Sequence, residues 1–405
     1  MQATSKRREG KASVRVPTFL TAGFRFYFLA AGLYAVFAML AWTAWLETQQ
    51  QGGILFAFPD AILPHLWHAH EMIFGYTVAV MAGFFLTAVP NWTGTKEAKA
   101  VFVSLSGLLW LSGRIAIWWA GVLDPLLVAI IDLAFVPLLA LNILPRLARK
   151  SQTRNLVFLF LLSALFTANL LVHLEWIGWT TATAEVGVRL GVLVSAAMIA
   201  IVGGRVVPAF TRNALTRAGQ TTKLPQSTPW LERAGILSAV LAALAILFPG
   251  ATAGWVCLLA GAINLARLSG WKGWRTVGSP ILWILHLAFF LLGTGYLVYG
   301  LALVFGILSE IAALHLLAVG AIGSMTLAMM TRAALGHSGR PLRAPIPIVI
   351  AYLGVVSAAI VRTFGTLLFD YFPVMIGSGA LWIAAFGIYA FVYFPILTKP
   401  RKTAT

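Results

Sequence analysis

The feature that most constrains this chain is a series of apolar runs, each long enough to cross a lipid bilayer. A transmembrane helix needs about 20 consecutive apolar residues. Twelve such runs can be counted, and their approximate bounds are 24–46, 69–90, 100–121, 124–144, 155–176, 187–209, 231–249, 251–268, 280–304, 310–331, 345–367 and 374–396. Because few residues remain between them, the sequence predicts an all-α polytopic membrane protein: a single transmembrane domain over residues 1–405 with no room for a soluble domain.

The amino-acid composition agrees with this class and excludes several others. Of the 405 residues, 60% are hydrophobic and 10% are charged, whereas about a quarter of the residues in a soluble domain are charged. The single cysteine, Cys257, rules out an intrachain disulfide and a thiolate metal cluster. The sequence also contains no Walker motif, no Rossmann glycine pattern and no nucleophile elbow.

The net charge of +17 would suit a nucleic-acid partner, but it is better explained by loop composition. Basic residues fill every second loop and both chain ends: Lys6, Arg7, Arg8, Lys11 and Arg15; Lys96 and Lys99; Arg146, Arg149, Lys150 and Arg154; Arg212, Arg217, Lys223 and Arg233; Lys272 and Arg275; Arg340 and Arg343; Lys399, Arg401 and Lys402. The loops between them carry mostly acids: Glu47, Asp60, Asp124, Glu175, Glu185, Glu310 and Asp370. By the positive-inside rule, we expect both termini in the cytoplasm and no nucleic-acid partner. Residues 1–17 then form a basic cytoplasmic tail, and the first apolar run reads as an uncleaved signal anchor.

Three of the predicted spans resemble one another. Span 2 ends in GFFLTAVPNWTG, span 6 in GGRVVPAFTRN and span 10 in LAMMTRAALGHSGR, and their centres lie about 120 residues apart, as in a repeat of helix groups. Small residues such as Gly75, Gly203 and Gly320 would let these helices pack closely. This spacing of about 120 residues predicts three repeats of four helices each, near 20–145, 150–270 and 278–398. They would form a pseudo-threefold bundle, unless the three spans look alike only because all are rich in Gly and Ala.

Five of the seven histidines fall at or near the predicted outer face, and they come from three helices. His65, His68 and His70 start span 2, His173 lies near the end of span 5, and His315 lies early in span 10. Ionisable groups at a membrane boundary are costly, so they are functional by default. Neutral imidazoles suit a haem or a copper ion. The sequence therefore predicts a haem or metal site at the outer face.

Helical spacing separates two of these histidines. His68 shares a face with Glu71, whereas His70 points nearly opposite. One of them can therefore ligate an iron while the other serves a second metal or an outer shell. A ligating histidine also needs its second ring nitrogen held, and Glu71, Glu175 and Glu310 are the carboxylates at this depth.

We expect His70 and His315, which head spans 2 and 10, to be the axial ligands of a haem b, with His68 as the alternative to His70. Haem propionates favour arginine partners. Three arginines lie in the outer halves of spans 3, 6 and 11: Arg114, Arg189 and Arg362. Because they oppose the positive-inside trend, each needs an internal partner, which is either a propionate or a carboxylate of the chain. His286, in the cytoplasmic half of span 9, is a further candidate ligand, or a histidine satisfied by a neighbouring carbonyl.

These residues resemble the NnrS family of bacterial membrane haem–copper proteins. The resemblance rests on HAHEMIFGYTVAVMAGFFLTAVPNWTG at His68–Gly94, GGRVVPAFTRN at Gly203–Asn213, and HLLAVGAIGSMTLAMMTRAALGHSGRPL at His315–Leu342, and it runs over nearly the whole chain. It implies a twelve-span protein of the bacterial inner membrane that contains haem and copper. It also implies a role in denitrification and in relieving nitrosative stress, with nitric oxide as the small-molecule ligand.

The gross plan also resembles the catalytic subunit of haem–copper oxidases, which has twelve helices, pseudo-threefold symmetry and low-spin haem ligands on helices 2 and 10. The counterparts here are His70 (or His68) and His315. Those oxidases take copper ligands from helix 6 and from the loop after it, but span 6 of this chain contains no histidine. We therefore do not expect a binuclear centre of that type. If copper binds, we infer His65, His68 and His173 as its ligands.

Three functions compete at this point. The first is a haem protein that binds nitric oxide near the periplasmic face and reduces or detoxifies it; Glu71, Glu175 and Glu310 would carry protons, and a quinol or a periplasmic donor would supply electrons. The second is a multi-pass transporter or copper-handling permease that uses the same histidine–glutamate cluster as its gate. The third is an assembly or signalling subunit in which metal serves stability only. Whether the protein is an enzyme stays open.

Overall fold

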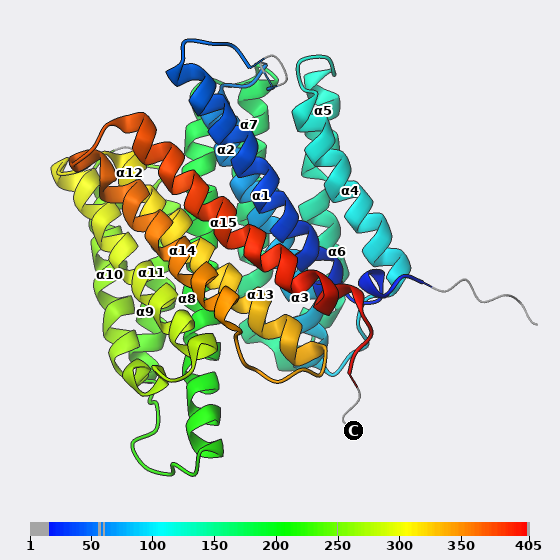
Figure 1. Cartoon of the computed structure of the whole chain (residues 1–405), viewed down its shortest axis with the longest axis vertical. Helices are drawn as coiled ribbons and strands as arrows, with labels where there is room; N and C mark the ends of the chain where they lie inside the picture. The colour runs from blue at the N-terminus through cyan, green and yellow to red at the C-terminus, as the bar shows by residue number, and fades with distance from the viewer. Residues whose placement is uncertain (1–15, 56–57, 60, 249, 403–405) are drawn as a thin grey trace, which may run out of the picture.

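The computed structural model describes residues 16–55, 58–59, 61–248 and 250–402, and every regular element in these ranges is helical (Figure 1). The predicted outer-loop acid Asp60 and most of the predicted basic tail lie outside the described residues. The α-helices are α1 (Gly23–Gln50), α2 (Pro64–His70), α3 (Val78–Thr93), α4 (Ala100–Trp118), α5 (Pro125–Leu133), α6 (Phe135–Leu147), α7 (Val157–Trp176), α8 (Thr183–Arg217), α9 (Pro229–Ala245), α10 (Thr252–Ser269), α11 (Pro280–Phe305), α12 (Glu310–His315), α13 (Ser324–His337), α14 (Ile346–Phe364) and α15 (Tyr371–Thr398). The π-helical segments are η2 (Glu71–Thr77) and η5 (Leu316–Gly323), and the short 3-10 segments are η1 (Thr18–Leu20), η3 (Lys150–Asn155), η4 (Gly273–Thr276) and η6 (Gly365–Leu367).

Eleven continuous helices in the described residues are long and apolar enough to cross a membrane. They follow the order of the predicted spans; α2, η2 and α3 together make span 2, and α12, η5 and α13 together make span 10. The remaining predicted span, 231–249, corresponds to α9, which has 17 residues and packs against both α8 and α10. The prediction of an all-helical, multi-pass membrane protein is therefore confirmed, with α9 as a shorter helix of the same bundle.

Local sequence chemistry explains where several of the helices begin and end. Asp124 caps α5: its side chain accepts hydrogen bonds from the N–H groups of Leu126 and Leu127, and Pro125 occupies the first helical position. Helix α3 ends at Gly94 and α11 ends at Gly306, which have φ angles of 62° and 65°. Glycine adopts this left-handed conformation without the steric cost that other residues meet.

Spans 2, 6 and 10 form the centre of the bundle. In their most apolar stretches, 83% of span 2, 83% of α8 and 78% of span 10 is buried. Helix α11 follows with 67%, and the other candidate membrane-spanning helices of the described residues reach only 33–44%. The outer helices expose large apolar side chains, such as Leu33 and Phe37 on α1 and Leu105 and Leu108 on α4. Apolar surface of this kind suits contact with lipid.

An apolar cavity of about 70 Å³ lies between the three central spans and α1. Its lining residues are Phe28, Thr77, Val80, Met81, Phe84, Ser195, Met198, Ile199, Val202, Gly203, Ile322, Met325, Thr326 and Met329. The three central spans are thus spans 2, 6 and 10, whose sequences resemble one another. The pseudo-threefold symmetry itself stays a prediction.

The two described ends of the chain lie at the same end of the bundle (Figure 1). Arg25, near the start of α1, donates hydrogen bonds to the carbonyl oxygens of Leu397 at 3.0 Å and Lys399 at 2.7 Å. The start of α1 therefore packs against the end of α15. In the segment between α6 and α7, Gln152 Nε2 donates a hydrogen bond of 3.2 Å to the carbonyl oxygen of Trp92, near the end of α3.

Candidate functional site

Helix α2 carries three histidines into the bundle at increasing depth. The helix starts with Pro64 at its first position, before the predicted start at residue 69, so His65 is already helical. His65 is exposed, His68 is half-buried and His70 is fully buried. His70 therefore lies in the protein interior, while His65 in the same short helix faces outward.

A π-helical segment begins directly after two of the histidines. Segment η2 follows His70 in span 2, and η5 follows His315 in span 10. Such segments are rare and are frequent at functional sites, because the wider turn redirects the side chains. Here the redirection explains a difference from the sequence analysis: Glu71, which ideal α-helical spacing places on the face of His68, contacts His70 instead.

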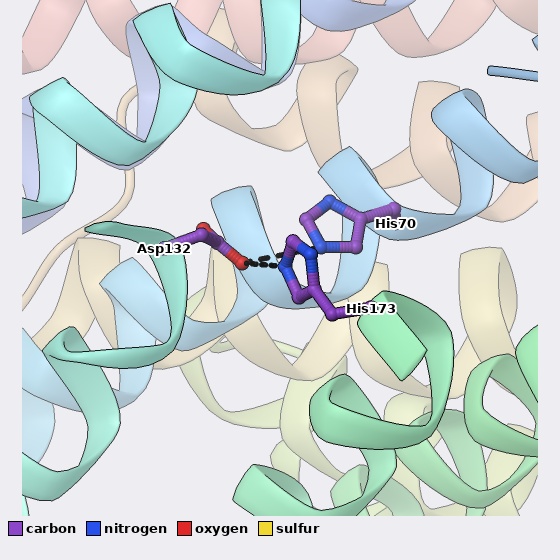
Figure 2. Close-up of side chains that lie close together, drawn as sticks. All are labelled: His70, Asp132 and His173. Carbon is purple, nitrogen blue, oxygen red and sulfur yellow. Dashed lines mark hydrogen bonds and ion pairs between the residues drawn. The ribbon is translucent and has the colours of Figure 1, made fainter. Parts of the chain in front are cut away.

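His70, Asp132 and His173 form a buried cluster that joins α2, α5 and α7, and their possible ligand atoms all lie within 4.8 Å of one another (Figure 2). His70 Nε2 lies 3.3 Å from Asp132 Oδ2, and His173 Nε2 lies 2.9 Å from the same oxygen. Asn169 joins the cluster: its Nδ2 donates to Asp132 Oδ2 at 2.8 Å, and its Oδ1 lies 2.9 Å from His70 Nε2. Three helices thus meet at one polar centre inside the membrane-spanning region.

Two further charged residues surround this cluster. Glu71 Oε1 lies 2.8 Å from His70 Nδ1 and accepts a hydrogen bond from Arg114 Nη1 at 2.6 Å. The other end of the guanidinium, Nη2, pairs with Asp132 Oδ1, and the Tyr34 hydroxyl donates to Glu71 Oε2. Buried charges are tolerated only when they are paired in this way. Of the two partners expected for Arg114, a haem propionate or a carboxylate of the chain, the structure shows carboxylates.

A second group lies on the other side of α2 and contains His68 and His315. The His68 ring stacks on Trp42 of α1, with ring centroids 4.7 Å apart and 15° between the planes. Arg362 lies near both His68 and His315, and His68 lies near His315, so a positive charge on one of these side chains disfavours a positive charge on the others. His315 Nδ1 donates to the carbonyl oxygen of Ile311 at 2.6 Å, which leaves Nε2 as the acceptor nitrogen of a neutral imidazole. As the helical spacing predicts, His68 and His70 contact different helices.

The other predicted acids and arginine take structural contacts. Arg189 pairs with Glu185 at 3.3 Å and with Glu310 at 3.7 Å, and all three side chains are partly exposed. Glu175 Oε2 accepts the backbone N–H of Ala184 at 2.7 Å, so it caps the start of α8. The proton-carrying role predicted for Glu71, Glu175 and Glu310 stays a prediction.

The predicted copper ligands His65, His68 and His173 are not brought together. His173 belongs to the Asp132 cluster, His68 stacks on Trp42, and His65 is exposed. His286 lies apart from both groups, with its Nε2 2.8 Å from Thr211 Oγ1, between α11 and α8.

Asp132 and Asn169 were not predicted as site residues, although the sequence around each contains a signal. Asp132 is a carboxylate in the apolar stretch Pro125–Leu147, where an unpaired charge would be expensive. Asn169 is a polar residue in Val157–Trp176, one helical turn before His173. Spacings of three and four residues place side chains on one helix face, so Asn169 and His173 predict a polar stripe on α7.

Comparison with known proteins assigns the family. The family model described as NnrS protein matches residues 18–401, which include every helix described above and both histidine groups. No curated protein matches the chain. The resemblance of the three quoted motifs is thereby confirmed over nearly the whole sequence. The chain belongs to the NnrS family.

Proposed function

We propose that this protein holds a haem between His68 and His315 and binds nitric oxide there. Family membership supports a haem- or metal-binding protein connected with nitric oxide. The observation that carries the residue assignment is the hydrogen bond from His315 Nδ1 to the carbonyl of Ile311. It fixes the imidazole and leaves Nε2 free to bind iron, which is the usual arrangement of a ligating histidine.

His68 is suited to hold the haem together with His315. Its buried Nδ1 has no hydrogen-bond partner within the described part of the chain, and an orphaned buried polar atom calls for a water or a ligand. His70 was the first choice from the sequence, but both of its ring nitrogens lie within 2.9 Å of side-chain oxygens. We therefore prefer His68, the alternative that the sequence left open.

Arg362 is the arginine best suited to a haem propionate. Arg114 and Arg189 are engaged by carboxylates. Arg362 lies near both His68 and His315, where its charge repels a proton on either imidazole, and it forms no ion pair with a carboxylate of the described residues. A propionate would supply the missing anion through charge-assisted hydrogen bonds.

The two histidines are held differently, and this bears on gas binding. A bound haem would supply an iron that takes up diatomic gases. His315 is fixed by a hydrogen bond, whereas the described contact of His68 is a ring stack on Trp42. If a haem is bound, His315 would therefore be the firmly held ligand and His68 the more readily released one. Reduction of the gas would further require electrons from a quinol or a periplasmic donor.

We place this site at the periplasmic face of the bacterial inner membrane, with both termini in the cytoplasm. The alternation of basic and acidic loops supports this orientation. His68 and His315 lie near the starts of spans 2 and 10, whereas the basic residues Lys96 and Arg340 follow the ends of the same spans. The histidines and these basic residues therefore fall on opposite sides.

A transporter or copper permease has less support. The cavity between the central spans is lined almost wholly by apolar atoms, and an apolar constriction opposes the passage of ions. The buried charged groups Glu71, Arg114 and Asp132 pair with one another and do not line this cavity.

Optical spectra of the detergent-purified protein test the proposal. Wild-type protein should show the Soret band of haem b and a shift of that band with nitric oxide. His315→Ala should lose the haem, while His286→Ala, a matched histidine outside both groups, should keep it. A well-folded wild-type protein without a Soret band, or a His315→Ala variant with an unchanged spectrum, would refute the proposal. Metal or solute uptake by haem-free proteoliposomes would favour the permease.

A further inference from the structure

The His70 imidazole faces carboxylate oxygens on both sides. Its Nδ1 lies 2.8 Å from Glu71 Oε1, and its Nε2 lies 3.3 Å from Asp132 Oδ2. A neutral imidazole carries one N–H, so it can donate on only one side. The other side needs either a proton or a metal ion between nitrogen and oxygen.

The charges of the buried group lead to the same requirement. Glu71 and Asp132 contribute two negative charges and Arg114 one positive charge, and all three side chains are buried. With neutral imidazoles on His70 and His173, the group lacks one positive charge. An uncompensated charge in the interior is strongly unfavourable, so the group must take up either a proton or a metal cation.

The spacing of the ligand atoms suits a small metal ion. Two ligands bound to a tetrahedral ion at roughly 2.0–2.2 Å lie roughly 3.3–3.6 Å apart. His70 Nε2 and Asp132 Oδ2 are 3.3 Å apart, at the lower edge of this range, and all three atoms lie within 4.8 Å of one another (Figure 2). His173 Nε2 and Asp132 Oδ2 are 2.9 Å apart and would separate slightly around an ion. The three side chains come from three helices and converge on one point.

The surrounding contacts are those of a supported metal site. A metal-bound histidine usually donates its second N–H to a carboxylate, and Glu71 is placed to accept it from His70 Nδ1. Arg114 holds Asp132 Oδ1, which leaves Oδ2 facing the two imidazoles. Asn169 Oδ1, 2.9 Å from His70 Nε2, is a further oxygen beside the same point.

We propose that His70 Nε2, His173 Nε2 and Asp132 Oδ2 bind one divalent first-row transition ion, at a site distinct from the His68–His315 pair. Two imidazoles and a carboxylate suit zinc, iron(II) or copper(II), and the absence of thiolate or thioether among these ligands disfavours copper(I). Three protein ligands leave a coordination position for water or a small ligand. This site does not depend on the haem.

Zinc alone is a suitable probe. Full-length protein purified in detergent would be stripped with a chelator, given Zn²⁺, desalted and assayed for retained metal by elemental analysis. We expect one zinc per chain in the wild type and in the control His286→Ala. Asp132→Asn and His173→Gln, which keep side-chain size and polarity, should lose the ion, and Glu71→Gln should weaken its affinity by about 10- to 100-fold. X-ray absorption should show imidazole and oxygen ligands.

Three results would overturn the metal site. They are a wild-type protein that retains no zinc, Asp132→Asn and His173→Gln variants that retain it as the wild type does, and an X-ray absorption spectrum without imidazole scattering. In the first case a proton on His70 supplies the missing charge. The X-ray spectrum needs no variant, so it decides the matter even if the substitutions prevent folding. A wild-type protein that binds zinc but shows no Soret band would contradict the haem proposal and leave the metal-site proposal standing.

Discussion

At the scale of single residues, Arg114 holds the buried network together. It bridges Glu71 and Asp132, and through them it positions His70. The partly exposed Arg189 also bridges two carboxylates, Glu185 and Glu310, but in contact with solvent. Burial, and not the number of partners, distinguishes the two arginines.

Replacing Arg114 by Ala should therefore destabilise the protein by about 3–5 kcal/mol, because two buried carboxylates lose their counter-charge. The matched variant Arg189→Ala should cost at most about 1 kcal/mol, since exposed ion pairs contribute little. The free energy of unfolding can be compared by titration from mild detergent into a denaturing one. Equal effects of the two substitutions would show that the Arg114 network does not stabilise the fold.

At the scale of elements, the two π-helical segments are the feature that links the sequence repeat to the site. They occupy equivalent places in spans 2 and 10, directly after His70 and His315. Segment η2 contains Gly75, and η5 contains Gly320 and, at its end, Gly323. The surroundings of Gly75 and Gly320 differ. A Cβ at Gly75 would lie 2.7 Å from Tyr34 and 2.8 Å from Arg114, whereas a Cβ at Gly320 would meet its nearest neighbour at 3.3 Å.

Gly75→Ala should accordingly cost about 1–3 kcal/mol through overpacking, and it should displace the side chains that hold Glu71. Gly320→Ala should be nearly neutral, because alanine favours helix and the neighbours need to move little. Thermal unfolding followed by circular dichroism would compare them. A Gly75→Ala variant as stable as Gly320→Ala would mean that the η2 segment tolerates a shift of Tyr34 and Arg114.

At the scale of the whole molecule, three buried spans are surrounded by more exposed helices, and each histidine group sits where span 2 meets its neighbours. The Asp132 cluster lies between span 2, α5 and α7, while the His68 group lies between span 2, α1 and span 10. One short helix, α2, thus supplies a histidine to each group.

The orientation of the bundle gives a direct prediction. A fluorescent protein fused after the C-terminus should fluoresce, because the alternation of loop charges predicts that this end lies in the cytoplasm. Alkaline phosphatase inserted in the loop around Thr180, between α7 and α8, should be active, because this loop is predicted to be periplasmic. Active phosphatase at the C-terminus would reverse the orientation and move the His68–His315 pair to the cytoplasmic side.

Much of the fold could be predicted from the sequence, because long apolar runs have few alternatives to transmembrane helices. The gathering of histidines from separate spans could be predicted for the same reason, since depth follows from topology. The partners of each histidine could not. They depend on the wider turn at Glu71, which alters helical facing, and on how α5 packs against α7, which brings Asp132 to His173.

The most direct test of the His68–His315 assignment is near-infrared magnetic circular dichroism of the oxidised protein, which reports the ligands of a haem iron. We expect the charge-transfer band of two imidazole ligands in the wild type. In His68→Ala we expect it to be replaced by a high-spin spectrum that still responds to nitric oxide. Retention of the two-imidazole band in His68→Ala, or in His315→Ala, would contradict the assignment of that residue as an axial ligand.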